Sequence, residues 1–502
     1  MYDVVLFSDT NGSIGWGRDA GAYTIASQLR RNGYKVKTID FFSFFDFNKF
    51  KNVIGNYVSE RTLFLGFSCT HMTSVLPQNL EDYYMNYQTK YKDNIVNVYL
   101  PFPPDTVIEW FAYVKELYPN IKTVVGGLKV AHKILLQRKY PFIDLWVGGL
   151  ADSSIIYIAD SLKNNINIPK KLIKSEIDQP YPEEEFCNSS IQWHKIDDTI
   201  FEGEALPIEI ARGCPFKCTF CDFPKRKKNT WIKNKETIKK ELIYNYENFG
   251  TTQYMISDSQ INESIHKMKM VHELFTSLPF KIEWTGFCRL ELLKIYPEMV
   301  DLIYESGCKS VMWGIETINP NTGKIIGKNT NLKQIEYLLN LCKERWGNEI
   351  ITGSGFVFGL PNETEETIKD LTNWLTVQPY LDSWVISALY IGDYDTKKSY
   401  AKSFSKIQQD PEKYGYSTKE SPDKWSHNNI SRDSMLNTVE EFYHESRHLR
   451  SIVAKHCYMR CLNLGFTHKE LLKANLGNED WVHEAIKRYR EMAEKYFKIN
   501  RI

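Results

Sequence analysis

Short apolar runs alternate with amphipathic segments along the first 165 residues of the chain. Runs rich in Val, Ile, Leu and Phe, such as DVVLFS and TLFLGFS, are separated by stretches with helical spacing, such as GAYTIASQLRRNGY. Strands that are buried on both faces have continuous apolar sequences, and helices connect such strands in a doubly wound parallel sheet. We therefore predict an α/β domain of the Rossmann-like type over residues 1–165, with about five strands.

A second alternating pattern, with a longer period, begins at Leu206. Six apolar runs are separated by segments with helical spacing, and such regular βα units are typical of a (β/α) barrel. We predict a partial (β/α)6 TIM-like barrel over residues 205–390, with its chemistry at the carboxyl ends of the strands. The expected strands are PIEIAR, QYMISD, KIEWTGF, SVMWGIE, GSGFVFGL and DSWVISAL, and the expected helices span Glu236–Phe249, Glu263–Ser277, Leu332–Glu344 and Glu365–Leu375.

The remaining segments lack this alternation. An aromatic stretch from Pro77 to Pro104 is expected to be an insertion in the first domain, and the polar residues 166–204 to form a linker. Residues 391–502 are expected to form a lid loop, from Asp393 to Arg432 with Trp425 inside it, and a C-terminal helical domain packed on the barrel. This last segment matches no motif with a known chemistry.

Composition narrows the classes of protein. Lys and Arg number 63 against 62 Asp and Glu, so the net charge of +1 does not indicate nucleic acid or an anionic membrane as a partner. The N-terminus lacks the pattern of a secretory signal, and no apolar run is long enough to span a membrane. We expect a cytoplasmic protein, in which ten cysteines are too sparse for a disulfide framework.

Three of these cysteines lie close together in RGCPFKCTFCDF, directly after the first predicted barrel strand. Cys214, Cys218 and Cys221 have the spacing C-x3-C-x2-C, and the nearest histidines are His194 and His266. A structural zinc site needs four ligands. A 4Fe-4S cluster that is held by three thiolates instead leaves one iron open for another ligand. The spacing favours the cluster over a zinc knot.

The motif C-x3-C-x-aromatic-C, with Phe220 as the aromatic residue, resembles the radical SAM superfamily. The resemblance implies that the three cysteines hold a 4Fe-4S cluster whose open iron binds S-adenosylmethionine (SAM). It also implies reductive cleavage of SAM to a 5′-deoxyadenosyl radical, with an electron donor such as flavodoxin or ferredoxin as a partner.

The same resemblance implies further cofactor contacts at the ends of the barrel strands. Gly355 and Gly359 in GFVFGLPNET match the motif that lines the adenosine, where the backbone approaches the ligand closely. Arg289 in GFCRLELL and Glu316 in WGIET match polar contacts to SAM, although both could equally form a salt bridge at the barrel mouth. Asp258 in YMISDSQIN is a further candidate of this kind.

A doubly wound domain before such a barrel resembles the cobalamin-binding subclass of the superfamily. Ser68 follows the third strand, and Gly126 and Gly127 follow the fourth, where open α/β sheets bind ligands. The cobalt-ligating D-x-H-x-x-G motif is absent, because the corresponding loop has the sequence DTNGS at residues 9–13. A domain that no longer binds cobalamin is therefore an alternative. Dinucleotide binding is another, although the glycines in GSIGWGRDAG are spaced one residue too far apart.

The resemblance favours cobalamin-dependent methylation of an unactivated carbon in a small molecule or peptide. One alternative is a radical SAM enzyme without cobalamin that catalyses a rearrangement or methylthiolation. RNA would be a possible substrate there, because basic residues that include Lys227 and Lys228 follow the cysteines. Another alternative is a non-catalytic, metal-stabilised binding protein. Cys457 and Cys461 could bind a second metal with His456, but core packing is the favoured explanation of two cysteines one helical turn apart. No catalytic residue is identified.

Overall fold

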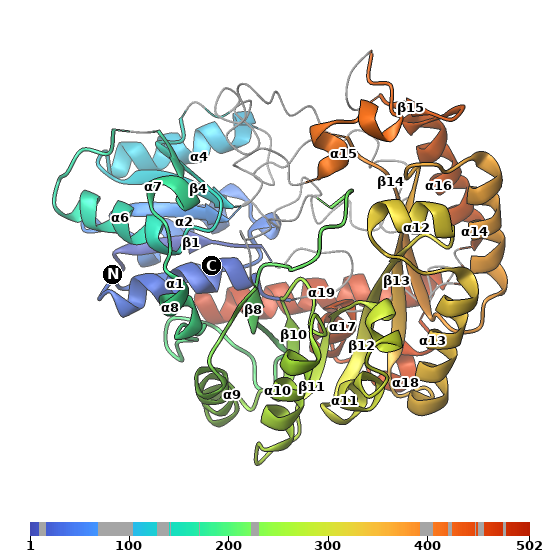
Figure 1. Ribbon diagram of the computed structural model, residues 1–502. Helices are drawn as coiled ribbons and strands as arrows, with labels where there is room; N and C mark the ends of the chain where they lie inside the picture. The colour runs from blue at the N-terminus through green and yellow to red at the C-terminus, as the bar shows by residue number, and fades with distance from the viewer. Residues whose placement is uncertain are drawn as a thin grey trace.

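The computed structural model contains two parallel sheets with helices packed around them (Figure 1). Four segments lie wholly or mostly outside the part that the structure describes: the loop at residues 9–13, the predicted insertion at 77–104, the basic residues 224–229 and the segment 392–404. The described residues are 1–9, 17–68, 104–127, 140, 142–169, 171–221, 230–391, 405–419, 424–446, 448–449, 456–474 and 478–502.

The first sheet is parallel with strand order β2-β1-β3-β4-β5-β6, and it confirms the predicted doubly wound domain. Val5 and Phe7 share one core with α2 and α4, whereas Val4 and Leu6 share another with α1 and α6, so both faces are covered. The elements are β1 (Val4–Phe7), α1 (Ala20–Arg31), β2 (Val36–Ile39), α2 (Phe47–Tyr57), β3 (Phe64–Ser68), α4 (Pro104–Leu117), β4 (Lys122–Gly127), β5 (Leu145–Gly148), α6 (Asp152–Lys163) and β6 (Leu172–Lys174).

The sixth strand, β6, lies in the segment that the sequence analysis predicted to be a linker. Ile173 pairs in register with Val147 of β5, so the sheet continues past residue 165. The strand was missed because it contains three residues with polar neighbours on both sides, which is too short for a clear apolar run.

The second sheet has six parallel strands in the order β14-β13-β12-β11-β10-β7, as predicted for a partial barrel. Tyr254 and Ile256 of β10 are fully buried in the core beneath the outer helices. The strands are β7 (Leu206–Ile208), β10 (Gln253–Ile256), β11 (Glu283–Cys288), β12 (Cys308–Glu316), β13 (Ile351–Phe358) and β14 (Ser383–Ala388). The helices are α9 (Lys235–Phe249), α10 (Ile265–Thr276), α11 (Met299–Glu305), α12 (Pro320–Ile326), α13 (Leu332–Trp346) and α14 (Glu365–Val377).

The C-terminal helices contact both domains. Helix α16 (Arg432–Ser446) lies along the edge strand β14, where the Tyr443 hydroxyl accepts a hydrogen bond from the amide of Ile386 at 2.6 Å, and α17 (His456–Asn463) contacts β10, β11 and β12. Helix α19 (Glu479–Asn500) instead ends against the N-terminal domain, with the rings of Tyr496 and Phe41 5.1 Å apart (Figure 1). The prediction that this region packs on the barrel therefore missed the contact of α19 with the N-terminal domain. None of the described helices has the length and apolar composition that crossing a bilayer requires.

A buried cation joins three distant parts of the chain. Arg18 donates hydrogen bonds to Asp40 at 2.7 Å, just after β2, and to Glu204 at 2.5 and 3.0 Å, just before β7. The amide of Asp40 donates to the Tyr496 hydroxyl of α19 at 3.0 Å. Burial raises the pKa of Glu204 to about 7, and the charge of Arg18 opposes this rise. Arg18 thereby connects the first sheet, the start of the barrel and α19.

Replacement of Arg18 by Met should destabilise the protein by about 3 to 5 kcal/mol, because Asp40 and Glu204 would stay buried without their cation. Urea unfolding followed by circular dichroism would measure the loss. Arg345→Met is the matched control, since Arg345 forms a solvent-exposed ion pair with Asp301 and its loss should leave the urea midpoint near that of the wild type. Equal midpoints for the two variants would contradict the structural role of Arg18.

Candidate functional site

The cysteine loop leaves the barrel directly after β7. Strand β8 (Ala211–Arg212) pairs antiparallel with β9 (Trp231–Ile232), so the cysteines lie in the loop between these two strands. Asp258 Oδ1 accepts hydrogen bonds from the amides of Ile210 and Ala211 at 2.8 and 2.9 Å, and its Oδ2 lies 2.8 Å from Lys267 Nζ. Both oxygens of Asp258 are thus engaged within the fold. Asp258 thereby shapes the base of the loop, and its contact with a cofactor stays a prediction.

The loop is held on two sides. The amide of Thr219 donates to the carbonyl of Ile326 at the end of α12, at 3.4 Å. The carbonyl of Thr219 accepts hydrogen bonds from the Ser405 hydroxyl at 3.0 Å and from the amide of Ile407 at 3.1 Å. Phe220 is half-buried and packs against the barrel core. The segment at 405–407 therefore supports the cysteine loop, which the sequence did not indicate.

The three cysteines of the loop are partly or largely buried. Cys218 is 9% exposed, Cys214 and Cys221 are half-buried, and the Cys221 amide donates to the Cys218 carbonyl at 3.4 Å. No three His, Cys, Asp or Glu side chains of the described residues are arranged to hold one metal ion. In a 4Fe-4S cluster each thiolate binds a different iron, so its cysteines need not converge on one point. Burial raises the pKa of the Cys214 thiol.

Arg289 lies against the cluster-binding loop. It is 3% exposed, its Nη1 donates to Cys218 Sγ at 3.3 Å, and its guanidinium is stacked 3.8 Å from the centre of the Phe216 ring. Nε donates to Glu291 at 2.7 Å, and Nη2 donates to Glu291 and to the carbonyl of Gly327, the latter at 3.0 Å. Four hydrogen bonds within the protein hold this side chain. Arg289 thus forms an ion pair at the barrel mouth, and its contact with SAM stays a prediction.

Glu316 ends β12 at the barrel mouth in a backbone conformation that is rare for residues other than glycine. Its φ is 70°, and the register between β12 and β13 shifts at this point. Burial raises the pKa of the Glu316 carboxyl, whereas Lys328, with Nζ 4.0 Å from Oε1, lowers it. A Cβ atom on Gly355 would lie 3.7 Å from Glu316 Oε2, so this glycine leaves space beside the carboxylate. Strained residues of this kind often occur at functional sites.

Gly359 lies against a buried tryptophan of the predicted lid, and its contact with SAM stays a prediction. Its φ is 83°, and a Cβ atom there would lie 2.3 Å from the indole of Trp425. The Gly359 carbonyl accepts a hydrogen bond from Tyr416 at 2.7 Å, and its amide donates to Glu363 at 2.9 Å. Gly359 thus allows Trp425 to pack on the barrel. Because Trp425 is fully buried and donates to the Leu389 carbonyl at 2.8 Å, the described part of the predicted lid is a packed element.

The predicted ligand residues of the N-terminal domain lie on one edge of its sheet. Ser68 and Gly126 are partners in register at the carboxyl ends of β3 and β4, and Gly127 follows with a φ of 137°. The Ser68 hydroxyl donates to Asp19 at 2.7 Å, and Asp19 caps α1 by accepting from the Gly21 amide at 2.9 Å. These residues frame the edge at which open α/β sheets bind ligands.

One buried ion pair connects this edge with the cysteine loop. Arg212, two residues before Cys214, donates to Asp152 at the start of α6 at 2.9 Å and to Glu209 at 2.7 and 2.8 Å. Since α6 follows the carboxyl end of β5, the two candidate cofactor edges belong to the same region of the molecule. The sequence did not indicate this pair, because its members lie 60 residues apart.

Several alternative sites have simpler explanations. Cys461 is fully buried in the core shared by α17 and α19, and burial raises its pKa well above the usual value, as expected for core packing. Gly17 packs against Arg460, because a Cβ atom there would lie 2.9 Å from the arginine Cγ. Gly15 lies outside the described residues, so the dinucleotide motif stays untested.

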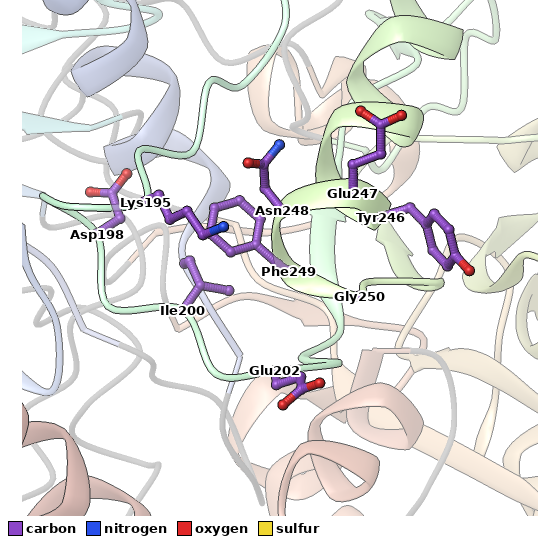
Figure 2. A pocket seen from close by; sticks show the side chains of 9 residues that line it. All are labelled: Lys195, Asp198, Ile200, Glu202, Tyr246, Glu247, Asn248, Phe249 and Gly250. Carbon is purple, nitrogen blue, oxygen red and sulfur yellow. The ribbon is translucent and has the colours of Figure 1, made fainter.

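A hollow at the end of α9 lies at the amino ends of the barrel strands, opposite the cysteine loop. Figure 2 shows its lining residues Lys195, Asp198, Ile200, Glu202, Tyr246, Glu247, Asn248, Phe249 and Gly250.

Comparison with protein families identifies a radical SAM domain in this chain. The model of the radical SAM superfamily matches residues 208–375, which include the cysteine loop and most of the barrel. The predicted radical SAM barrel is thereby confirmed over these residues.

The curated relatives have different activities. The chain is 23% identical over 313 residues to an anaerobic magnesium-protoporphyrin IX monomethyl ester cyclase of Rubrivivax gelatinosus, covering 56% of this chain and 55% of the relative. It is 25% identical to an uncharacterized methyltransferase of Pyrococcus horikoshii, covering 51% and 58%. It is also 26% identical to a ribosomal protein uS12 methylthiotransferase of Clostridium botulinum, covering 54% and 59%. The chain thus spans little more than half the length of these relatives.

Two solved structures share the whole arrangement of domains. The radical SAM methyltransferase TsrM of Kitasatospora setae, solved with tryptophan and a SAM analogue, matches 98% of this chain and 100% of its own at 15% identity, with a TM-score of 0.62. The cobalamin-dependent radical enzyme OxsB, with aqua-cobalamin and SAM bound, matches 100% of this chain and 80% of its own at 12% identity, with a TM-score of 0.58. At these identities the likeness shows a common fold.

The packing of Gly359 against Trp425 can be tested by a pair of glycine variants. Gly33 has a similar φ of 82° with no atom near its missing Cβ, so Gly33→Ala should cost only the backbone strain of about 1 to 2 kcal/mol. Gly359→Ala adds a steric overlap with Trp425, which should cost a further ~1 to 3 kcal/mol. Urea unfolding would measure both. Equal losses would show that Trp425 does not pack there.

Proposed function

We propose that this radical SAM enzyme is a cobalamin-dependent methyltransferase that acts on an unactivated carbon of a small molecule or peptide. The observation that carries the proposal is the Arg212–Asp152 pair at 2.9 Å, which ties the carboxyl edge of the N-terminal sheet to the cysteine loop. Methyl transfer to a substrate radical requires the methyl source and the radical source to face one substrate, and a fixed connection between the two edges serves this need.

Particular residues would bind the cluster, SAM and cobalamin. Cys214, Cys218 and Cys221 would hold the cluster, which with SAM supplies a 5′-deoxyadenosyl radical, while cobalamin would supply the methyl group. Glu316 lies beside Gly355, and its carboxylate could accept hydrogen bonds from the ammonium or ribose of SAM. Gly126 and Gly127 lack side chains at the sheet edge, where the backbone could approach a corrin closely. An electron donor such as flavodoxin or ferredoxin would reduce the cluster.

A radical SAM reaction without cobalamin is the second candidate. It is supported by the loop DTNGS at residues 9–13, which offers no histidine to a cobalt ion, and by the methylthiolation activity named for the Clostridium relatives. The N-terminal domain would then serve as a scaffold or hold part of the substrate. RNA as the substrate would draw on the basic residues 224–229, which lie outside the described part of the chain.

Cys218→Ala should lower the iron content and reduce the formation of 5′-deoxyadenosine by at least about 100-fold, because a cluster ligand is lost. The measurements are iron analysis and chromatography of the SAM products after anaerobic reconstitution with dithionite as the reductant. Cys342→Ala is the control, because Cys342 is a buried cysteine on α13 outside the loop. Normal iron and product in the Cys218 variant would contradict the assignment of the cluster ligands.

Protein purified without oxygen from cells supplied with cobalamin should co-elute with about one corrinoid per chain in gel filtration, as a single ligand site in an open α/β domain predicts. Gly126→Leu should decrease the corrinoid content and leave the iron content unchanged, since a side chain would fill the sheet edge. Gly55→Leu is the control, because a Cβ atom at Gly55 on α2 would meet no neighbour. Absence of corrinoid from the wild type, with iron present, would favour the second candidate.

A further inference from the structure

Arg289 is fixed in contact with a residue that the cluster requires. Its Nη1 lies 3.3 Å from Cys218 Sγ, and stacking on Phe216 at 3.8 Å holds the plane of the guanidinium. The carboxylate of Glu291 and the carbonyl of Gly327 accept its other hydrogen bonds. With 3% exposure, the side chain has little freedom to turn toward another partner.

A fixed donor on a cluster thiolate has a known physical consequence. Hydrogen bonds to the sulfurs, net charge and solvent exposure set the reduction potential of an iron-sulfur cluster. Reduction adds a negative charge to the cluster, and this charge spreads onto its thiolates. A nearby cation and an N–H donor stabilise the reduced state more than the oxidised state, so they raise the potential. A carboxylate at the same place has the opposite effect.

The surrounding charges alternate in sign. Glu291 pairs with Arg289 and also lies 4.0 Å from Lys328 Nζ, which in turn lies 4.0 Å from Glu316. The net positive charge next to Cys218 therefore depends on the balance between the guanidinium of Arg289 and the carboxylate of Glu291 that pairs with it. Removal of the charge of Arg289 and removal of the charge of Glu291 should therefore shift this balance in opposite directions.

We propose that Arg289 and Glu291 together set the reduction potential of the cluster, with Arg289 raising it through Cys218 and Glu291 partly offsetting this effect. Arg289 is thereby a tuning residue of the cluster rather than a SAM ligand. The inference deepens the proposed function and rests on the cluster being bound by Cys214, Cys218 and Cys221.

The test is a redox titration followed by electron paramagnetic resonance on the anaerobically reconstituted full chain, without SAM. Arg289→Met removes the charge and the donor at nearly constant length, and should shift the midpoint to more negative values by a tenfold change in the oxidised-to-reduced ratio, which is about 59 mV for one electron. Glu291→Gln should shift it to more positive values. Arg345→Met, at an exposed arginine on α13, is the matched control and should not move it.

Each outcome bears on a different claim. Opposite shifts for the two variants, with iron content near that of the wild type, support the proposal, because a merely structural role would not reverse sign with charge. Unchanged potentials, or shifts of the same sign, overturn it. Should Arg289→Met fail to hold iron, Arg289→Lys keeps the charge and gives the same test with a smaller negative shift. A wild-type protein without a cluster signal would refute the cluster assignment itself, and the inference with it.

Discussion

The buried Arg18 cluster is the interaction on which the arrangement of the domains depends. A guanidinium removed from water is costly unless carboxylates and further acceptors surround it, and only the correct packing of three chain segments supplies them here. Asp40 comes from the first sheet, Glu204 from the start of the barrel, and Tyr496 of α19 binds the Asp40 backbone. The pairing is specific, because a misplaced sheet or helix would leave a charge buried without a partner.

This arrangement also determines where the chemistry can occur. With the sheets oriented by Arg18, the Arg212–Asp152 pair joins the carboxyl edge of the first sheet to the residues just before Cys214. Asp258 then directs the chain into the cysteine loop by accepting hydrogen bonds from two consecutive backbone amides. Buried ion pairs contribute little net stability, but they favour one geometry over its competitors. Here they relate a candidate cobalamin edge to a cluster loop from a separate domain.

The parts of the structure that follow from periodicity and local motifs were predictable. Six barrel strands, four of their helices and the cysteine loop were identified because apolar runs and cysteine spacing are properties of neighbouring residues. Features that depend on partners distant in sequence were not. The apolar stripe of α19 indicates burial but not the surface that covers it, Gly359 carries no sign of Trp425, and the contact of Ser405 with Thr219 joins residues 186 positions apart.

The same distinction applies to the hydrogen bonds of Arg289. Its position after a barrel strand matches a residue that contacts SAM in the superfamily, but a motif does not show which acceptors a side chain finds in three dimensions. Glu291, two residues later, and Gly327, at the end of α12, take up the guanidinium and turn it toward Cys218. Glu316 lies 4.0 Å from Lys328 and beside Gly355. At the barrel mouth Arg289 is therefore fixed by neighbours that its own motif does not reveal.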